Sequence, residues 1–122
     1  MNDDDLVIEI AHPPFGHERA FASLYVAKVC ILRGMLVTVV LRGEGVFTGL
    51  RGQQAPMDNI NLPSTEAQLE EILGLDARVV AEREALEHGG IGEGELVNGI
   101  ETVSTKEIHD IIMNTTSKAI SF

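Results

Sequence analysis

The sequence predicts a single α/β domain built on a parallel sheet, and three observations support this. Short apolar runs alternate along the chain with segments of helical periodicity, an order typical of parallel sheets covered by helices. The hydrophobic fraction is 44%, but aromatic residues make up only 4% and tryptophan is absent. A core of Val, Ile, Leu and Ala suits a parallel sheet buried on both faces. The 122 residues suffice for one domain with a substantial core.

The first predicted strand covers the apolar run 6–11, and the segment His12-Pro13-Pro14-Phe15-Gly16 ends it because proline cannot continue a central strand. From His17 the apolar positions follow helical spacing, and Gly34 closes that helix. The next strand covers residues 35–41 (MLVTVVL), whose apolar, β-branched composition predicts complete burial.

The first helix also carries a second apolar stripe, formed by Phe21, Tyr25 and Leu32. Packing on one sheet requires only one apolar face. Two explanations stay open: an interface in a homo-oligomer, or a domain interior crowded by other helices.

The middle of the chain predicts a third strand between two helices. Residues 46–50 could form a short helix, and 51–63 resemble an irregular loop. Residues 65–73 predict a helix with a Thr65/Gln68 capping-box pattern and Gly74 as its stop. The third strand covers residues 77–81, and a short helix over 82–87 follows it.

The last quarter predicts a strand, a helix and a final strand. The fourth strand covers residues 100–103, and Ser104 with Glu107 forms a capping box for the helix that follows. The core stripe of that helix is Ile108, Ile111 and Ile112. Residues 118–122 form the fifth strand. The domain therefore extends over 1–122, with residues 1–5 expected to be disordered.

The alternation of strands and helices predicts a three-layer domain with the flavodoxin-like strand order 2-1-3-4-5. In such sheets ligands bind beyond the carboxyl ends of the strands where the order reverses, here between the first and third strands. The predicted pocket at this point comprises His12, Pro14, Phe15, Gly16, His17, Glu18, Glu82 and Arg83.

This pocket could bind an anion or carry out acid–base chemistry, and both possibilities stay open. Helix N-termini near His17 and Glu82 could bind an anion, unless acidic residues in the first turns satisfy those helix ends internally. A histidine and a glutamate could also form a general acid–base pair.

Composition argues against several classes of partner. The net charge of −10 would repel nucleic acid and anionic membrane surfaces. The apolar stretches are interrupted by Lys28, Arg33 and Arg42, so no transmembrane helix is expected. The start of the chain (MNDDD) is acidic, unlike a signal peptide, and the expected location is the cytoplasm.

Side chains suited to metal or redox chemistry are sparse. The single cysteine, Cys30, lies among apolar residues of the first helix, where an inert core role is the usual one. The histidines lack metal-site spacing, so neither a metal nor a cofactor is expected. The glycine-rich run 89–94 (GGIGEG) follows a helix and does not match a dinucleotide fingerprint, so we interpret it as a helix end and a turn.

Five segments, in order and almost from end to end, resemble the DsrE family of small sulfur-handling proteins. They are 13–20 (PPFGHERA), 39–46 (VVLRGEGV), 86–91 (LEHGGI), 95–101 (ELVNGIE) and 118–122 (KAISF). The resemblance implies a flavodoxin-like fold, homo- or hetero-oligomers such as trimers and hexamers, and persulfide transfer.

The same resemblance implies where a sulfur-carrying cysteine would lie. In catalytic relatives it follows the third strand, often as one of a pair, and the two positions correspond to Glu82 and Ala85 here. A carboxylate cannot form a persulfide, because the sulfur carrier must be a nucleophilic thiolate. Some relatives that lack the cysteine serve as companion subunits, and this chain resembles those.

Three hypotheses follow. The first is a non-catalytic, oligomeric or accessory subunit in sulfur relay, working as a homo-oligomer, with a cysteine-bearing DsrE-like partner subunit, or both. The second is a small-molecule-binding protein, or an enzyme that uses Glu82 with His12 or His17. The third is a purely structural homo-oligomer.

Overall fold

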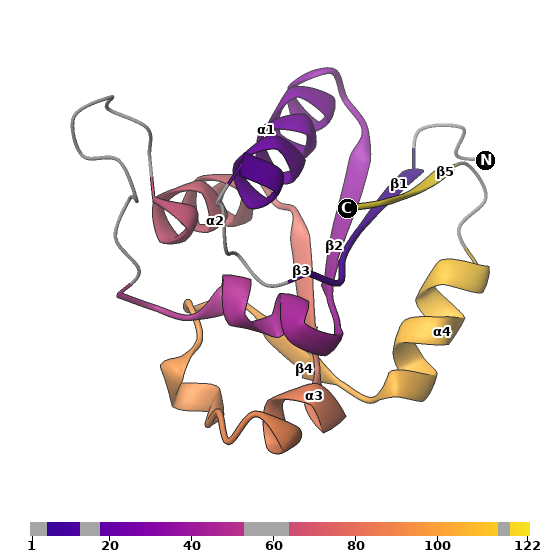
Figure 1. Cartoon of the computed structure of the whole chain (residues 1–122). Helices are drawn as coiled ribbons and strands as arrows, with labels where there is room; N and C mark the ends of the chain where they lie inside the picture. Colours follow the sequence, from indigo (N-terminus) through magenta and orange to yellow (C-terminus); the bar gives the residue numbers. More distant parts are fainter. Residues whose placement is uncertain (1–4, 13–17, 53–63, 115–117) are drawn as a thin grey trace.

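A five-stranded parallel sheet forms the middle layer of the molecule (Figure 1). The computed structural model describes residues 5–12, 18–52, 64–114 and 118–122. The strands are β1 (Asp5–Ile10), β2 (Leu36–Leu41), β3 (Arg78–Glu82), β4 (Glu101–Val103) and β5 (Lys118–Ser121). Each strand begins and ends within one residue of its predicted range, and Asp5, expected to be disordered, already belongs to β1. The predicted class, a parallel α/β domain in three layers, is confirmed.

The strands lie in the order β4-β3-β2-β1-β5, and the predicted order 2-1-3-4-5 is wrong in this respect. In the predicted order β1 pairs with β3, whereas in the structure β2 lies between them. Val39 of β2 is in register with Ile8 of β1 on one side and with Val79 of β3 on the other. The sheet therefore reverses between β1 and β5. An interior position suits β2, since its branched apolar residues are buried on both faces.

Helices cover both faces of this sheet, as Figure 1 shows. The chain forms α1 (Glu18–Leu32), the 3-10 helix η1 (Gly43–Gly49), α2 (Thr65–Gly74), α3 (Arg83–His88), the 3-10 helix η3 (Glu93–Glu95) and α4 (Thr105–Met113). Helices α1 and α2 pack on one face, and α4 lies on the other. Among the helices of the described ranges, none has the length and apolar character that crossing a membrane would require.

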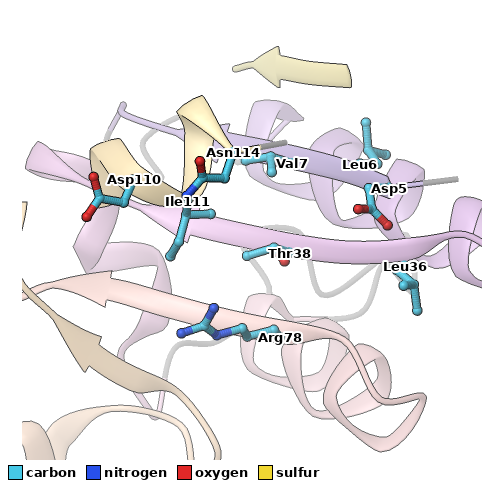
Figure 2. A pocket seen from close by; sticks show the side chains of 9 residues that line it. All are labelled: Asp5, Leu6, Val7, Leu36, Thr38, Arg78, Asp110, Ile111 and Asn114. Carbon is cyan, nitrogen blue, oxygen red and sulfur yellow. The ribbon is translucent and has the colours of Figure 1, made fainter. Parts of the chain in front are cut away.

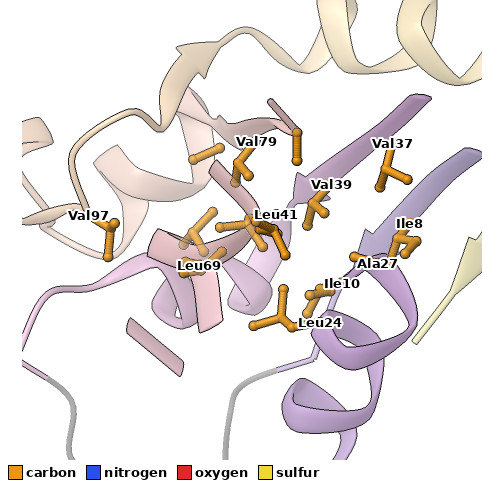
Figure 3. Close-up of a cluster of buried hydrophobic side chains, with 14 of the residues drawn as sticks. Ile8, Ile10, Leu24, Ala27, Val37, Val39, Leu41, Leu69, Val79 and Val97 are labelled. Carbon is orange, nitrogen blue, oxygen red and sulfur yellow. The ribbon is translucent and has the colours of Figure 1, made fainter. Parts of the chain in front are cut away.

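The core is divided unequally between the two faces. Under α1 and α2, alternate residues of the central strands pack with helix side chains such as Leu24, Ala27 and Leu69 (Figure 3). Under α4, the buried cluster is small and consists of Val7, Val40, Val80, Val103 and Ile108. One short helix therefore shields the second face.

Two of the three residues in the second apolar stripe of α1 face outward, whereas Phe21 is half-buried beside α2. Tyr25 is 55% exposed and Leu32 is 64% exposed. A crowded domain interior therefore does not explain Tyr25 and Leu32, and the oligomer interface stays a prediction.

The ends of two helices test the predicted caps. Ser104 accepts a hydrogen bond from Glu107 N at 3.1 Å and donates its own backbone N–H to Glu107 Oε1 at 3.2 Å, which confirms that capping box. The Thr65/Gln68 box is wrong, because Ser64 is the N-cap of α2 and accepts from Ala67 N at 3.1 Å. The serine directly before the threonine is itself a favoured N-cap residue, although Ala67 cannot complete a capping box with it.

Candidate functional site

A cavity of about 460 Å³ opens at the carboxyl edge of the sheet, beyond the ends of β2 and β3. The lining residues come from the end of β3 and from the segments that follow β2 and β3. They are Gly43, Glu44, Phe47, Glu82, Glu84, Ala85, His88 and Gly89. We call this cavity the Glu82 pocket.

Close packing of η1 against the end of β1 forms one side of the pocket. A Cβ atom on Gly45 would lie 1.9 Å from the carbonyl oxygen of Ile10, so only glycine permits this approach. Gly43 has φ of +54°, in the left-handed region that favours glycine. These two glycines let the chain turn sharply after β2 and bring the first amide of η1 over the sheet edge.

Glu82 is the last residue of β3, and 9% of the residue is exposed. Its Oε1 accepts a hydrogen bond from Gly43 N at 2.9 Å. Its Oε2 accepts from the Thr105 hydroxyl at 2.6 Å. The side chain does not cap α3, which begins at the next residue. Glu82 instead ties the start of η1 to the first turn of α4.

Glu84, on the exposed rim, is bound in a similar way. Its Oε1 accepts from Thr105 N at 3.0 Å. The hydrogen bond from its own backbone N–H, which outweighs the opposing effect of desolvation, lowers the pKa of Glu84, and Thr105 and Arg83 lower it further. Both carboxylates therefore serve as hydrogen-bond acceptors for helix starts, the internal alternative to an anion site at these helix ends.

Of the residues predicted to form one pocket, the structure places the side chains of His12, Glu82 and Arg83. His12 is exposed at the end of β1, and since β2 lies between β1 and β3, two strand spacings of about 5 Å each part it from the Glu82 strand. Arg83 is exposed and is not among the lining residues. Pro14, Phe15, Gly16 and His17 lie outside the described residues, and α1 begins at Glu18.

Sequence reasoning missed the side chains that η1 and α3 supply, notably Glu44, Phe47 and His88. A signal for them existed. The short, glycine-rich turn after the buried strand β2 would have pointed to this edge once β2 was placed beside β3.

At the point where the strand order does reverse, a small polar cluster joins β1 and β5 to the residue that follows β2. Arg42 Nη1 donates to Glu9 Oε2 at 2.7 Å, and the Ser121 hydroxyl donates to Glu9 Oε1 at 2.7 Å. Burial favours the neutral form of this carboxyl, but the hydrogen bonds from Ser121 and Arg42 together outweigh it and lower the pKa of Glu9, with a further contribution from His109. The cluster therefore fastens β5 to the edge of the sheet.

A second cavity, of about 410 Å³, lies on the α4 face near the amino ends of the strands (Figure 2). Its wall includes Thr38 and Arg78, which are in register on β2 and β3, together with Ile111 and Asn114 of α4. Ligands of parallel α/β sheets bind at the opposite, carboxyl edge. The Glu82 pocket is therefore the stronger candidate.

The only cysteine lies far from this pocket along the sheet. Cys30 is half-buried on α1 against the main core, and its carbonyl oxygen accepts from Met35 N at 3.0 Å, next to the start of β2. It therefore lies at the amino edge, one strand length from Glu82. Within the described ranges, no three His, Cys, Asp or Glu side chains are grouped so that they could hold a metal ion.

The chain is similar to known proteins in sequence and in fold. The sequence model of the DsrE/DsrF-like family matches residues 4–122. The uncharacterized protein MK0008 of Methanopyrus kandleri is 28% identical over 109 residues, which cover 89% of this chain and 84% of that protein.

Solved structures show the same fold. The crystal structure of the ychN protein from E. coli superposes with a TM-score of 0.85 at 22% identity, covering 100% of both chains. A protein of unknown function, MTH1491 from Methanobacterium thermoautotrophicum, gives a TM-score of 0.70 at 19% identity, with 97% of this chain and 98% of that chain covered. These likenesses extend over the whole domain.

Proposed function

This chain belongs to the DsrE/DsrF-like family, and we propose that it acts there as a non-catalytic, oligomer-forming or accessory subunit in sulfur relay. One observation carries the proposal. The position that resembles the relatives' sulfur-carrying cysteine is Glu82, whose carboxylate is buried and bound by Gly43 and Thr105. The second such position, Ala85, lines the same pocket.

Sulfur transfer requires a group that Glu82 does not have. A protein thiolate attacks the outer sulfur of a donor persulfide, the sulfur–sulfur bond of the donor breaks, and the donor leaves as a thiolate. A carboxylate gives no stable sulfur–sulfur product. The hydrogen bonds that Glu82 accepts are also the ones that hold η1 and α4 in place, so its contacts support a structural role.

An accessory role needs a partner. Leu32, near the end of α1, and Leu36, at the start of β2, are each 64% exposed and lie near the amino edge of the sheet. These side chains support an interface there with further copies, as a trimer or hexamer, with a cysteine-bearing family member, or with both. Isolation of the native complex tests this: co-purification of a cysteine-bearing DsrE-like chain supports the accessory role, whereas a strict monomer with no partner contradicts it.

The non-catalytic part has its own test. The wild-type protein and a Cys30→Ser control are incubated with a persulfide donor that carries labelled sulfane sulfur, and bound label is mapped by mass spectrometry. We expect no stable label on either protein. Glu82→Cys, which restores a thiol at the pocket, provides the positive control. Stable persulfide on Cys30 of the wild-type protein, passed on to an acceptor, would refute the proposal.

The volume of the pocket favours a second candidate, a small-molecule-binding protein or an enzyme that uses Glu82. The cavity of about 460 Å³ falls within the usual range for ligand sites. Among the described residues, His88 also lines it. A metabolite panel screened by thermal shift tests this function: a ligand that stabilises the wild-type protein but not Glu82→Gln supports it. If the protein forms a homo-oligomer but binds neither a ligand nor a partner chain, the purely structural role is the remaining hypothesis.

A further inference from the structure

A third cavity, of about 200 Å³, lies between α1 and α2 on the face of the sheet that carries the main core. Its apolar lining includes Leu24 of α1 and Ile72 of α2, both almost completely buried. This cavity shares no lining residue with the Glu82 pocket in the part of the chain that the structure describes. We call it the interhelical cavity.

Gln68 gives the interhelical cavity an unusual feature, an acceptor without a donor. The residue is 6% exposed and lines the cavity. Its Nε2 donates to the carbonyl oxygen of Phe21 at 3.2 Å. Its Oε1 has no hydrogen-bond partner among the described residues. Leaving a buried acceptor unpaired is costly, so a molecule that donates to this oxygen gains binding energy.

The contact with Phe21 also fixes which end of the amide is free. If the amide were turned over, its oxygen would face the Phe21 carbonyl oxygen, and two acceptors would meet. Gln68 therefore presents an acceptor, and the complementary ligand must carry an N–H or O–H donor.

Two further contacts define the rest of the ligand. The rings of Phe21 and Tyr25 are nearly parallel, with centroids 6.2 Å apart, and both line the cavity. Flat aromatic surface of this kind favours a planar ring. At the rim, Lys28 Nζ and Glu71 Oε2 form an ion pair of 2.8 Å, so the opposite charges compensate each other and favour neither an anion nor a cation.

We propose that the interhelical cavity binds a small, uncharged, planar ring compound that donates an N–H or O–H hydrogen bond to Gln68 Oε1. The class comprises single-ring or fused two-ring nitrogen heterocycles and phenols, because about 200 Å³ is below the range for larger ligands. Because Oε1 is enclosed, the ligand reaches it only when a side chain that lines the cavity shifts.

Matched probe pairs test the proposal. Phenol and toluene have nearly the same shape but differ in the donor, and indole and 1-methylindole differ in the same way. In ¹H–¹⁵N NMR titrations of the wild-type protein, phenol and indole should give saturating shifts at the amides of Tyr25, Gln68 and Ile72. The donor-free partners should bind about tenfold more weakly, the usual effect of one buried hydrogen bond.

Variants assign the preference to one atom. Gln68→Met removes the acceptor but keeps a similar side-chain volume. In this variant, phenol and toluene should bind with about equal affinity, as should indole and 1-methylindole. Glu70→Gln, an exposed change on the same helix, should leave it intact. Equal binding of phenol and toluene to the wild-type protein overturns the proposal, as does the absence of saturating shifts around α1 and α2. The wild-type ratio decides the matter even if Gln68→Met does not fold.

Discussion

Replacing Thr105 with valine should destabilise the protein by about 1.5–3 kcal/mol. Valine keeps the branched shape of threonine but lacks the hydroxyl that donates to Glu82 Oε2 at 2.6 Å. Because Glu82 is only 9% exposed, little water can replace this bond, which is made to a carboxylate in a largely enclosed position. For a domain of this size, the loss corresponds to a fall in Tm of roughly 5–15 °C.

Thermal and urea unfolding, followed by circular dichroism, measure this loss against a matched control. Thr102, on the neighbouring strand β4, makes no side-chain hydrogen bond with the described residues, so Thr102→Val should change the free energy of unfolding by less than about 0.5 kcal/mol. If Thr105→Val is no more destabilising than Thr102→Val, the hydrogen bond to Glu82 does not support the fold as argued.

Three further predictions concern other contacts. Gly45→Ala should prevent stable folding, because the added Cβ would lie 1.9 Å from the carbonyl oxygen of Ile10. The control variant Gly94→Ala, whose added Cβ would have no heavy atom within 4 Å, should accumulate normally in soluble form. Ser104→Ala removes the N-cap of α4 and should cost about 1 kcal/mol in urea unfolding, and an unchanged midpoint would contradict the capping box. Because the pKa of Glu9 is lowered in the folded protein, the Glu9 carboxylate is protonated in the unfolded chain at a higher pH than in the folded chain. The contribution of Glu9 to stability is therefore present above the unfolded pKa and is lost as pH falls through the folded pKa. Below about pH 5, the urea midpoint of Glu9→Gln should therefore fall less steeply with decreasing pH than that of the wild-type protein. An equally steep fall in both proteins would show that Glu9 does not contribute to stability in this way.

Local patterns located the secondary structure well, because each element depends on residues close together in sequence. Alternation of apolar residues defined the strands, and Ser104 with Glu107 marked the start of α4. At α2 the adjacent Ser64 and Thr65 offered two equivalent caps, and only the hydrogen bond to Ala67 N decides between them.

The strand order was predicted incorrectly although one segment already argued against it. The flavodoxin-like order places the second strand at an edge of the sheet. Residues 36–41 (LVTVVL) are almost entirely apolar, a composition that favours an interior strand with both faces covered. The exposed Glu101 on β4 and the exposed Ile120 on β5 are consistent with the observed edges. Burial of each strand therefore contained more information about the order than the alternation of elements did.

The site was predictable only in part for a related reason. Glu82 ends a strand, so it lies at the carboxyl edge whatever the order. Its partners Gly43 and Thr105 are 39 and 23 residues away in sequence, and no local pattern connects them to it. Such contacts depend on which strands are neighbours and on how η1 folds back.

The unequal core also sets the order in which parts of the native molecule open. Helix α4 covers its face over only a small buried cluster, so its amides should exchange with solvent through a partial opening that leaves the other layers intact. The amides of β2, paired on both sides, should exchange only on global unfolding. Opening of α4 withdraws the Thr105 hydroxyl from Glu82. A sparsely populated state with an uncovered Glu82 carboxylate therefore precedes unfolding of the domain, and native-state hydrogen exchange at α4 measures its population.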